Sequence, residues 1–376
     1  MDIRSGSILS DKVIYSNPGD HQLDLLPGRD PKGDFHYLLV RNTAATSGFM
    51  HPVSEYNNDK VQITTGLSAL YLSDQLQPTL KDLSSSANGG AFLCSLTDAR
   101  GQLTVISFEK EQLIVERFGP DGQFQKKMTS PLEYRPDGFK WNRKEWLGQL
   151  DPDNGNIVAF SIAQQLRHAY LNTFVFDFAT GQIAFQQKDE LNKDYFRSLK
   201  DNAEMTRAKH FKLVEKLEPD NILFTKDRLI TFNEIRYDRL FAQNSGGCED
   251  AEGIVVSIYD RQQYHLLDQL LLDRYQESKI NTGRGLSYTI RDGKIHAFGC
   301  ENTSTWPYEY ANFYFVIDPE KNVAERKTPD WGTVQQSDPV DTQHILWFRN
   351  GIVRPTKGAG FLVDSDIHTY LAKLNF

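Results

Sequence analysis

The chain has 376 residues, of which 39% are hydrophobic and 12% aromatic, and this composition excludes an intrinsically disordered protein. Its formal net charge of −8 argues against a surface that wraps nucleic acid, because such a surface is normally basic. The three cysteines, Cys94, Cys248 and Cys300, form no Cys-x-x-Cys pair, so neither a zinc knuckle nor a disulfide framework is indicated.

The first residues lack the apolar stretch of a secretory signal. No segment approaches the run of about 18 apolar residues that a membrane-spanning helix needs. We therefore expect a cytoplasmic protein with no membrane partner. A chain exported by a specialised secretion system would have the same appearance.

The first 90 residues contain strand-like runs but poor turn signals, so they predict one blade or nearly two. From residue 91 onward, extended apolar runs alternate with short polar turns. Four of these turns, at 98–101, 153–155, 291–293 and 349–351, are Asp/Asn-Gly or related sequences. Such pairs favour tight hairpins because their central residues adopt positive φ at little cost.

Two successive hairpins make one four-stranded antiparallel sheet. The turn spacing predicts such sheets at 91–130, 145–190, 221–271, 284–331 and 341–376, in addition to residues 1–90. We therefore predict an all-β fold, an irregular β-propeller of six or seven four-stranded blades forming a single domain over 1–376. The alternative is a pair of β-sandwich domains that separate near 129–145. The hairpins resemble those of β-propellers in general, without the signatures of WD or kelch repeats.

One segment, 191–217, has apolar residues at helical spacing and an excess of three positive charges. We predict a helical insertion here. Its basic face is either the solvated side of a packed helix or a docking surface for an acidic partner.

The connections within and between the predicted blades differ in length. The long ones, at 129–145, 190–221, 238–253, 271–284 and 302–312, would all emerge on one face, with the short turns on the other. Because loops on a rigid scaffold usually carry binding sites, this face is the predicted site of contact with a protein or a small-molecule ligand.

Aromatic residues cluster in two of these long connections. Trp306, Tyr308 and Tyr310 flank Glu309, and Trp141 and Trp146 lie in a second cluster. Rings of this kind suit a binding hot spot or sugar stacking. The competing interpretation is that they fold back and cover the loops.

Candidate catalytic groups are fewer. Glu249 and Glu301 lie in two similar four-residue sequences, 247–250 and 299–302, and paired carboxylates are suited to acid–base chemistry. His36, His296 and His344 lie in or beside predicted inner strands, where converging histidines could bind a metal. Each residue also has a structural explanation, as a loop cap or as a hydrogen-bonded strand histidine.

We predict a non-catalytic binding module that uses the loop-rich face of a propeller. The alternative is a metal-dependent hydrolase or lyase with an axial active site, for which His296, His344, Glu249 and Glu301 are the suspects. A lectin-like carbohydrate binder is the second alternative. The sequence contains neither a Walker loop nor a Gly-x-Ser-x-Gly elbow, and it identifies no cofactor.

Overall fold

The computed structural model describes residues 22–29, 35–42, 64–72, 77–83, 85, 90–98, 100–109, 112–131, 146–165, 168–177, 179–180, 182–191, 217–239, 248–278, 286–305, 308–327, 346–348, 351–357 and 369–375. All regular structure in these residues is β-strand. They include no helix of the length and apolarity that crossing a lipid bilayer requires.

The strands form antiparallel sheets, each made of strands that follow one another in the sequence. Sheet A contains β1 (Gln22–Arg29), β2 (Phe35–Asn42), β3 (Thr64–Leu72) and β4 (Pro78–Leu83). Sheet B contains β5 (Ala91–Thr97), β6 (Leu103–Glu109), β7 (Gln112–Phe118) and β8 (Phe124–Pro131). Sheet C contains β9 (Trp146–Leu150), β10 (Ile157–Gln165), β11 (His168–Asp177) and β12 (Gln182–Glu190).

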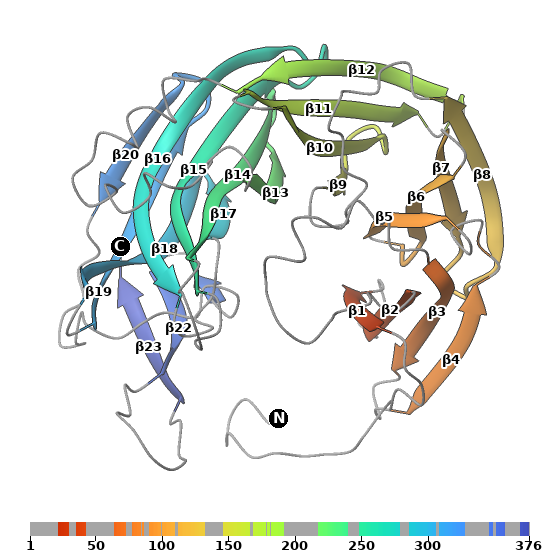
Figure 1. Cartoon of the computed structure of the whole chain (residues 1–376), viewed down its shortest axis with the longest axis horizontal. Coiled ribbons are helices and arrows are strands. Elements are labelled where there is room, and N and C mark those ends of the chain that lie inside the picture. Colours follow the sequence, from red (N-terminus) through yellow and green to blue (C-terminus); the bar gives the residue numbers. More distant parts are fainter. Residues whose placement is uncertain are drawn as a thin grey trace. The chain divides into compact units, whose positions relative to one another are not determined.

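Three further sheets follow in the second half of the chain. Sheet D contains β13 (Leu217–Phe224), β14 (Arg228–Arg239), β15 (Cys248–Asp260) and β16 (Leu266–Ser278). Sheet E contains β17 (Ser287–Arg291), β18 (Lys294–Thr305), β19 (Tyr308–Asp318) and β20 (Val323–Lys327). Sheet F contains β21 (Leu346–Phe348), β22 (Gly351–Lys357) and β23 (Thr369–Asn375). Figure 1 shows the strands of each sheet in neighbouring colours.

Four-stranded meanders repeated along a chain are the blades of a β-propeller, so the predicted all-β propeller class is confirmed. Five of the six described sheets have four strands. The predicted helical insertion is not supported. Residue Leu191 has no regular structure, Leu217 already begins β13, and residues 192–216 lie outside the described part of the chain.

The chain separates into two compact units. The first unit contains residues 1–159 and 174–184, and the second contains residues 160–173 and 185–376. Their boundary runs through sheet C. The prediction of a single domain stays a prediction.

The hairpins form where the sequence places turn residues. Between β17 and β18, Asp292 has φ 49° and Gly293 has φ 74°, the left-handed conformation that a two-residue hairpin requires. Between β5 and β6, the Asp98 carboxylate accepts hydrogen bonds from the backbone N–H groups of Arg100 and Gln102, both at 2.8 Å. These local preferences specify the turn positions.

Apolar side chains join neighbouring sheets within each unit. Sheets A and B share a buried cluster of Leu38, Val40, Leu67, Ala69, Leu83, Phe92, Leu103, Val105 and Phe118. Sheets D and E share a second cluster of Ile230, Phe232, Ile254, Val256, Ile258, Leu272, Leu286, Ile295, Ala297, Phe313, Phe315 and Ile317. Successive side chains of a strand point to opposite faces of its sheet, so every second residue faces the neighbouring sheet. Packing between blades therefore depends on apolar residues at every second position of the strands.

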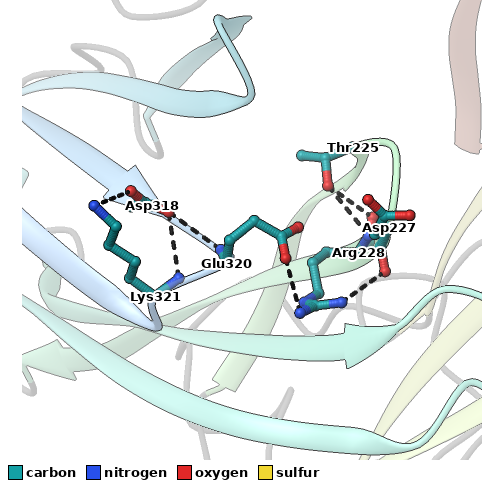
Figure 2. Close-up of polar contacts among 6 residues, drawn as sticks. All are labelled: Thr225, Asp227, Arg228, Asp318, Glu320 and Lys321. Atoms are coloured by element: carbon teal, nitrogen blue, oxygen red, sulfur yellow. Dashed lines mark hydrogen bonds and ion pairs between the residues drawn. The ribbon is translucent and has the colours of Figure 1, made fainter.

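The short turns of sheets D and E lie together. Figure 2 shows the β13–β14 turn beside the β19–β20 turn, joined by an ion pair of 2.8 Å between Arg228 and Glu320. Arg261, from the β15–β16 turn, donates a hydrogen bond of 2.6 Å to the backbone oxygen of Thr225. In these two sheets the short turns therefore occupy one common end, as the connection lengths predicted.

The opposite end differs from the prediction. Residues 302–312 do not form a loop, because β18 and β19 continue through them and leave only 306–307 as the connection. The predicted excursions 238–253 and 271–284 are likewise shortened by β14, β15 and β16. Thr and Tyr favour extended backbone, and this local preference outweighs the polar, loop-like composition of these segments.

Candidate functional site

The predicted aromatic anchors lie on a ribbon that extends beyond its sheet. Strand β17 pairs with β18 only over Lys294–Phe298, and β20 pairs with β19 only over Tyr314–Asp318. Residues 299–305 and 308–313, here called the ribbon, pair with each other and with no third strand in the described part of the chain. Among the described residues, both edges of the ribbon therefore carry backbone groups that no third strand pairs with.

Three of the predicted binding residues fall at the tip of this ribbon. Tyr308 pairs with Thr305, Glu309 with Ser304, and Tyr310 with Asn302. A bulge at 302–304 changes the register just below the tip. Bulges increase local twist and frequently occur beside functional sites.

The tryptophans of the two predicted clusters differ in their placement. Trp306 and Trp141 lie outside the described residues. Trp146 begins β9, is 3% exposed, and stacks on Phe174 with ring centroids 5.3 Å apart. This ring is part of the packing of sheet C.

The two candidate glutamates occupy different kinds of position. Glu301 lies in the second strand of sheet E, opposite Ala311, whereas Glu249 is the second residue of the third strand of sheet D, opposite Asp238. The similar sequences around them are therefore not structurally equivalent. A pairing of the two carboxylates stays a prediction.

Of the three candidate metal-binding histidines, only His296 has a described side chain. His36 lies in β2 opposite Tyr71, His296 lies in β18 opposite Val316, and His344 lies outside the described part of the chain. The described side chains contain no group of three or more His, Cys, Asp or Glu residues placed to hold a metal ion.

His296 has an unusual environment. Its ring stacks beside Tyr314 with centroids 6.5 Å apart, and its Nδ1 atom is buried without a hydrogen-bond partner among the described residues. Burial lowers the pKa of His296, and the nearby positive charges of Arg291 and Lys327 lower it further. The neutral imidazole is therefore the favoured form.

A second site, which the sequence did not indicate, lies between sheets C and D within the second unit. Polar side chains from β11 and β12 meet polar side chains from β15 and the β15–β16 turn. We call this group the polar seam, and it consists of Thr173, Gln187, Asp189, Ser257, Tyr259 and His265.

Asp189 is the central charged group of the polar seam. It is 9% exposed, and its Oδ1 accepts a hydrogen bond of 2.6 Å from Gln187. The Gln187 Oε1 atom lies 3.3 Å from Nδ1 of His265. Burial raises the pKa of Asp189, and this effect exceeds the opposing influences of Gln187, the His265 charge and Tyr259.

Tyr259 lies on the other side of the polar seam. Its side chain is completely buried, and its ring packs 5.5 Å from that of Phe160. Burial raises the pKa of the phenol well above its usual value, and the neighbouring Asp189 charge raises it further. The hydroxyl is therefore protonated across the physiological range.

The sequence carried only a weak signal for the polar seam. Asp189 stands in a polar run, 186–190, that is indistinguishable from an exposed edge strand. Its carboxylate is buried in the structure, where β12 contacts the β15–β16 turn of sheet D. No motif spacing could have paired it with Tyr259, because the two residues belong to different blades.

No protein-family model and no curated protein matches the chain. Among solved structures, the chain is similar to the β-propeller domain of Nup133 from Vanderwaltozyma polyspora. The identity is 8% and the TM-score 0.42, covering 97% of this chain and 84% of that one. A protein of unknown function from Dyadobacter fermentans has 11% identity and a TM-score of 0.41, covering 96% of both chains.

A mutant of the Synechocystis apocarotenoid oxygenase is also similar, with 9% identity and a TM-score of 0.36. The alignment covers 77% of this chain and 66% of the oxygenase, so the chain spans just under two thirds of that protein's length. Similarities at this level carry no argument about function.

Proposed function

We propose that this chain is a non-catalytic binding module and that the ribbon of sheet E is its principal contact element. The observation that carries the proposal is that β18 and β19 extend beyond the described residues of both flanking strands. Phe313 at the base of the ribbon packs in the cluster that joins sheets D and E, whereas a four-stranded blade does not need the two-stranded extension beyond it. Its length therefore favours a role in contacting another molecule.

The chemistry of the ribbon favours a protein partner. An unpaired strand edge offers backbone N–H and C=O groups to an extended segment, which can pair with it as an additional strand. Tyrosines are enriched in binding hot spots because they bury a large ring and also carry a hydrogen-bonding hydroxyl. Tyr308 and Tyr310 alternate with Glu309 in β19, so aromatic groups and an acidic group are both present at the tip.

The other functional interpretations stay predictions. The metal-dependent enzyme requires a convergence of histidines and carboxylates, and the side chains of its suspects Glu249, Glu301 and His344 lie outside the described ones. The lectin-like binder requires aromatic pockets that recur between blades. An acidic partner for the basic segment 191–217 also stays a prediction.

The proposal can be tested by selecting a library of random peptides displayed on phage against the wild-type protein and against the double variant Tyr308→Ala, Tyr310→Ala. We expect the wild type to enrich peptides of a common pattern. The double variant is expected to bind the enriched peptides at least about tenfold more weakly, because hot-spot tyrosines contribute at least about 1–2 kcal/mol.

Phe124→Ala provides a matched control, because Phe124 is an exposed aromatic residue of sheet B. It should bind the selected peptides as well as the wild type does. Equal binding by all three proteins, with unchanged thermal unfolding, would show that the ribbon is not the contact element.

A further inference from the structure

The two edges of the ribbon are not equivalent. The β18 edge continues the side of the sheet that β17 covers, and the β19 edge continues the side that β20 covers. At the base of the β18 edge, Leu286 still flanks Gly299, where an added Cβ atom would clash with its Cδ2. The β19 edge belongs to the strand that carries Tyr308 and Tyr310.

The direction of the backbone groups in sheet E follows from the β17–β18 hairpin. Asp292 and Gly293 form its two-residue turn, both with positive φ. In such a hairpin the closing pair, here Arg291 and Lys294, is hydrogen-bonded. Hydrogen-bonded and non-hydrogen-bonded pairs then alternate along each antiparallel ladder. This alternation directs the backbone groups of odd-numbered residues of β19 toward β18 and those of even-numbered residues toward the other side.

Even-numbered residues of the ribbon therefore carry the groups of the β19 edge. Lower in the sheet, groups of this parity pair with β20, as at Tyr314 opposite Lys327. Tyr310 and Asn312 have the same parity, so each directs one N–H and one C=O away from β18. In the part of the chain that the structure describes, no strand on that side pairs with them.

The sequence after β20 is unsuited to fill this edge. A continuation of β20 in the same register would place Pro329 opposite Asn312. That position requires a backbone N–H, which proline lacks. The β19 edge is therefore left to a segment other than the one that follows β20.

The base of the β19 edge is held against sheet D. The guanidinium of Arg326 lies 4.8 Å from the centroid of the Phe313 ring, and its Nη1 donates a hydrogen bond of 3.3 Å to the backbone oxygen of Asp273. Phe313 is 1% exposed and belongs to the cluster that joins sheets D and E. A strand that is already extended loses less conformational freedom when a peptide pairs with it.

The composition of the ribbon favours a basic partner. The ribbon contains Glu301 and Glu309 and no lysine or arginine. Opposite charges on neighbouring strands stabilise their pairing, and like charges oppose it. Lys327 stands at the lower end of the β19 edge, so basic residues of a partner fit best toward the tip, near Glu309. A second copy of the ribbon would bring two acidic strands together, which favours a segment of another protein.

We propose that the β19 edge of the ribbon, 308–313, is a strand-addition site for an extended, basic segment of another protein, which pairs antiparallel to β19. Antiparallel pairing is slightly more stable per residue than parallel pairing, and it continues the direction of β20. The N-terminal end of the segment then lies near Lys327 and its basic C-terminal end near the tip. This inference rests on the proposed function and specifies the edge, the direction and the charge of the partner.

Hydrogen exchange in the free, full-length protein tests whether the edge is open. We expect the amide protons of Tyr310 and Asn312 to exchange faster in NMR spectra than those of Ala311 and Phe313, which are bonded to β18. Slow exchange at all four positions in the monomer would show that another segment of this chain fills the edge. Slow exchange that appears only at high protein concentration, with a doubled mass in sedimentation, would show that a second copy fills it. Either result would overturn the proposal.

The probe for the edge is the acetylated and amidated peptide Thr-Val-Thr-Val-Lys-Val-Lys. Its β-branched residues favour an extended backbone, and its lysines lie toward the C-terminal end. At about ten times its dissociation constant, it should slow the exchange of Tyr310 and Asn312 about tenfold and leave Ala311 and Phe313 unchanged. The matched peptide with glutamate in place of lysine should bind at least about fivefold more weakly.

Backbone methylation of the probe separates strand addition from contact through side chains alone. An N-methyl group removes one N–H and keeps the side chain. Methylation at successive positions should weaken binding about tenfold at every second residue and little at the residues between, because only alternate N–H groups face β19.

The charge of the ribbon is tested in the protein. Glu309→Gln should weaken binding of the lysine peptide about twofold or more. Glu325→Gln is the matched control, because the Glu325 side chain is 70% exposed on β20 and lies outside the ribbon. It should bind the peptide as the wild type does.

Failure of this inference can be distinguished from failure of the proposed function. Phage-selected peptides that require Tyr308 and Tyr310 but leave the exchange of Asn312 unchanged would overturn strand addition and keep the ribbon as the contact element. An equal effect of methylation at every position, or equal binding of the glutamate peptide, would also overturn this inference alone. Absence of binding by the lysine peptide and by every selected peptide would overturn both.

Discussion

The start of the ribbon depends on a close approach that only glycine permits. A Cβ atom added to Gly299 would clash with Cδ2 of Leu286 and would lie 3.1 Å from Cζ of Phe313. Both neighbours are buried in the cluster that joins sheets D and E, so neither can move away without disturbing the core. We therefore expect Gly299→Ala to be destabilising.

The magnitude follows from two opposing effects. Overpacking of a well-packed core costs about 1–3 kcal/mol. Replacing glycine with alanine reduces the conformational entropy of the unfolded chain, which stabilises the folded protein by about 0.4–1 kcal/mol. The net loss in the free energy of unfolding should be about 1–2 kcal/mol.

Urea unfolding measures this loss as a lower midpoint at an unchanged slope. Leu286→Ala should cost about 2–5 kcal/mol in the wild type and less in the Gly299→Ala background, because there it also removes the clash. A Gly299→Ala variant as stable as the wild type, or an additive double variant, would refute the argument from close approach.

Two further predictions concern the junction between sheets D and E. Phe232 is completely buried, and its ring centroid lies 4.3 Å from that of Tyr288. Phe232→Ala should therefore lower the free energy of unfolding, measured in urea, by about 3–5 kcal/mol. Leu267→Ala, at an exposed position, is the control and should lower it by less than about 0.5 kcal/mol. The Arg228–Glu320 pair has side chains that are 21% and 50% exposed. A double-mutant cycle with Arg228→Gln and Glu320→Gln should give a coupling below about 1 kcal/mol that decreases with salt, and a larger, salt-independent coupling would contradict this.

The hairpin positions could be predicted because they depend on short stretches of sequence. Asp292-Gly293 specifies its own turn, and the Asp98 side chain caps another through bonds to residues two and four positions later. The strand limits were harder to predict. The Thr and Tyr residues of 302–312 were expected in a loop, but cross-strand pairing extends through them and ends only at 306–307.

The candidate site was predicted in part. Tyr308, Glu309 and Tyr310 were singled out by composition, and their position on an extended ribbon came only from the pairing of β17 and β20. Trp146 was grouped with possible surface anchors, yet its ring stacks on Phe174 from another strand of the same sheet. Whether an aromatic ring faces solvent or core depends on what lies across from it, which no local pattern specifies.

The sequence by itself determined the turns, the alternation of the strands and hence the all-β class, because turn chemistry and strand periodicity act over a few residues. The tertiary structure decided which strands extend beyond the strands beside them and which polar groups become buried. Gln187 and His265, 78 residues apart in the chain, meet in the polar seam only because the packing of sheets C and D brings them into contact. The same packing withdraws water from Asp189 and gives an ordinary aspartate of an edge strand a raised pKa.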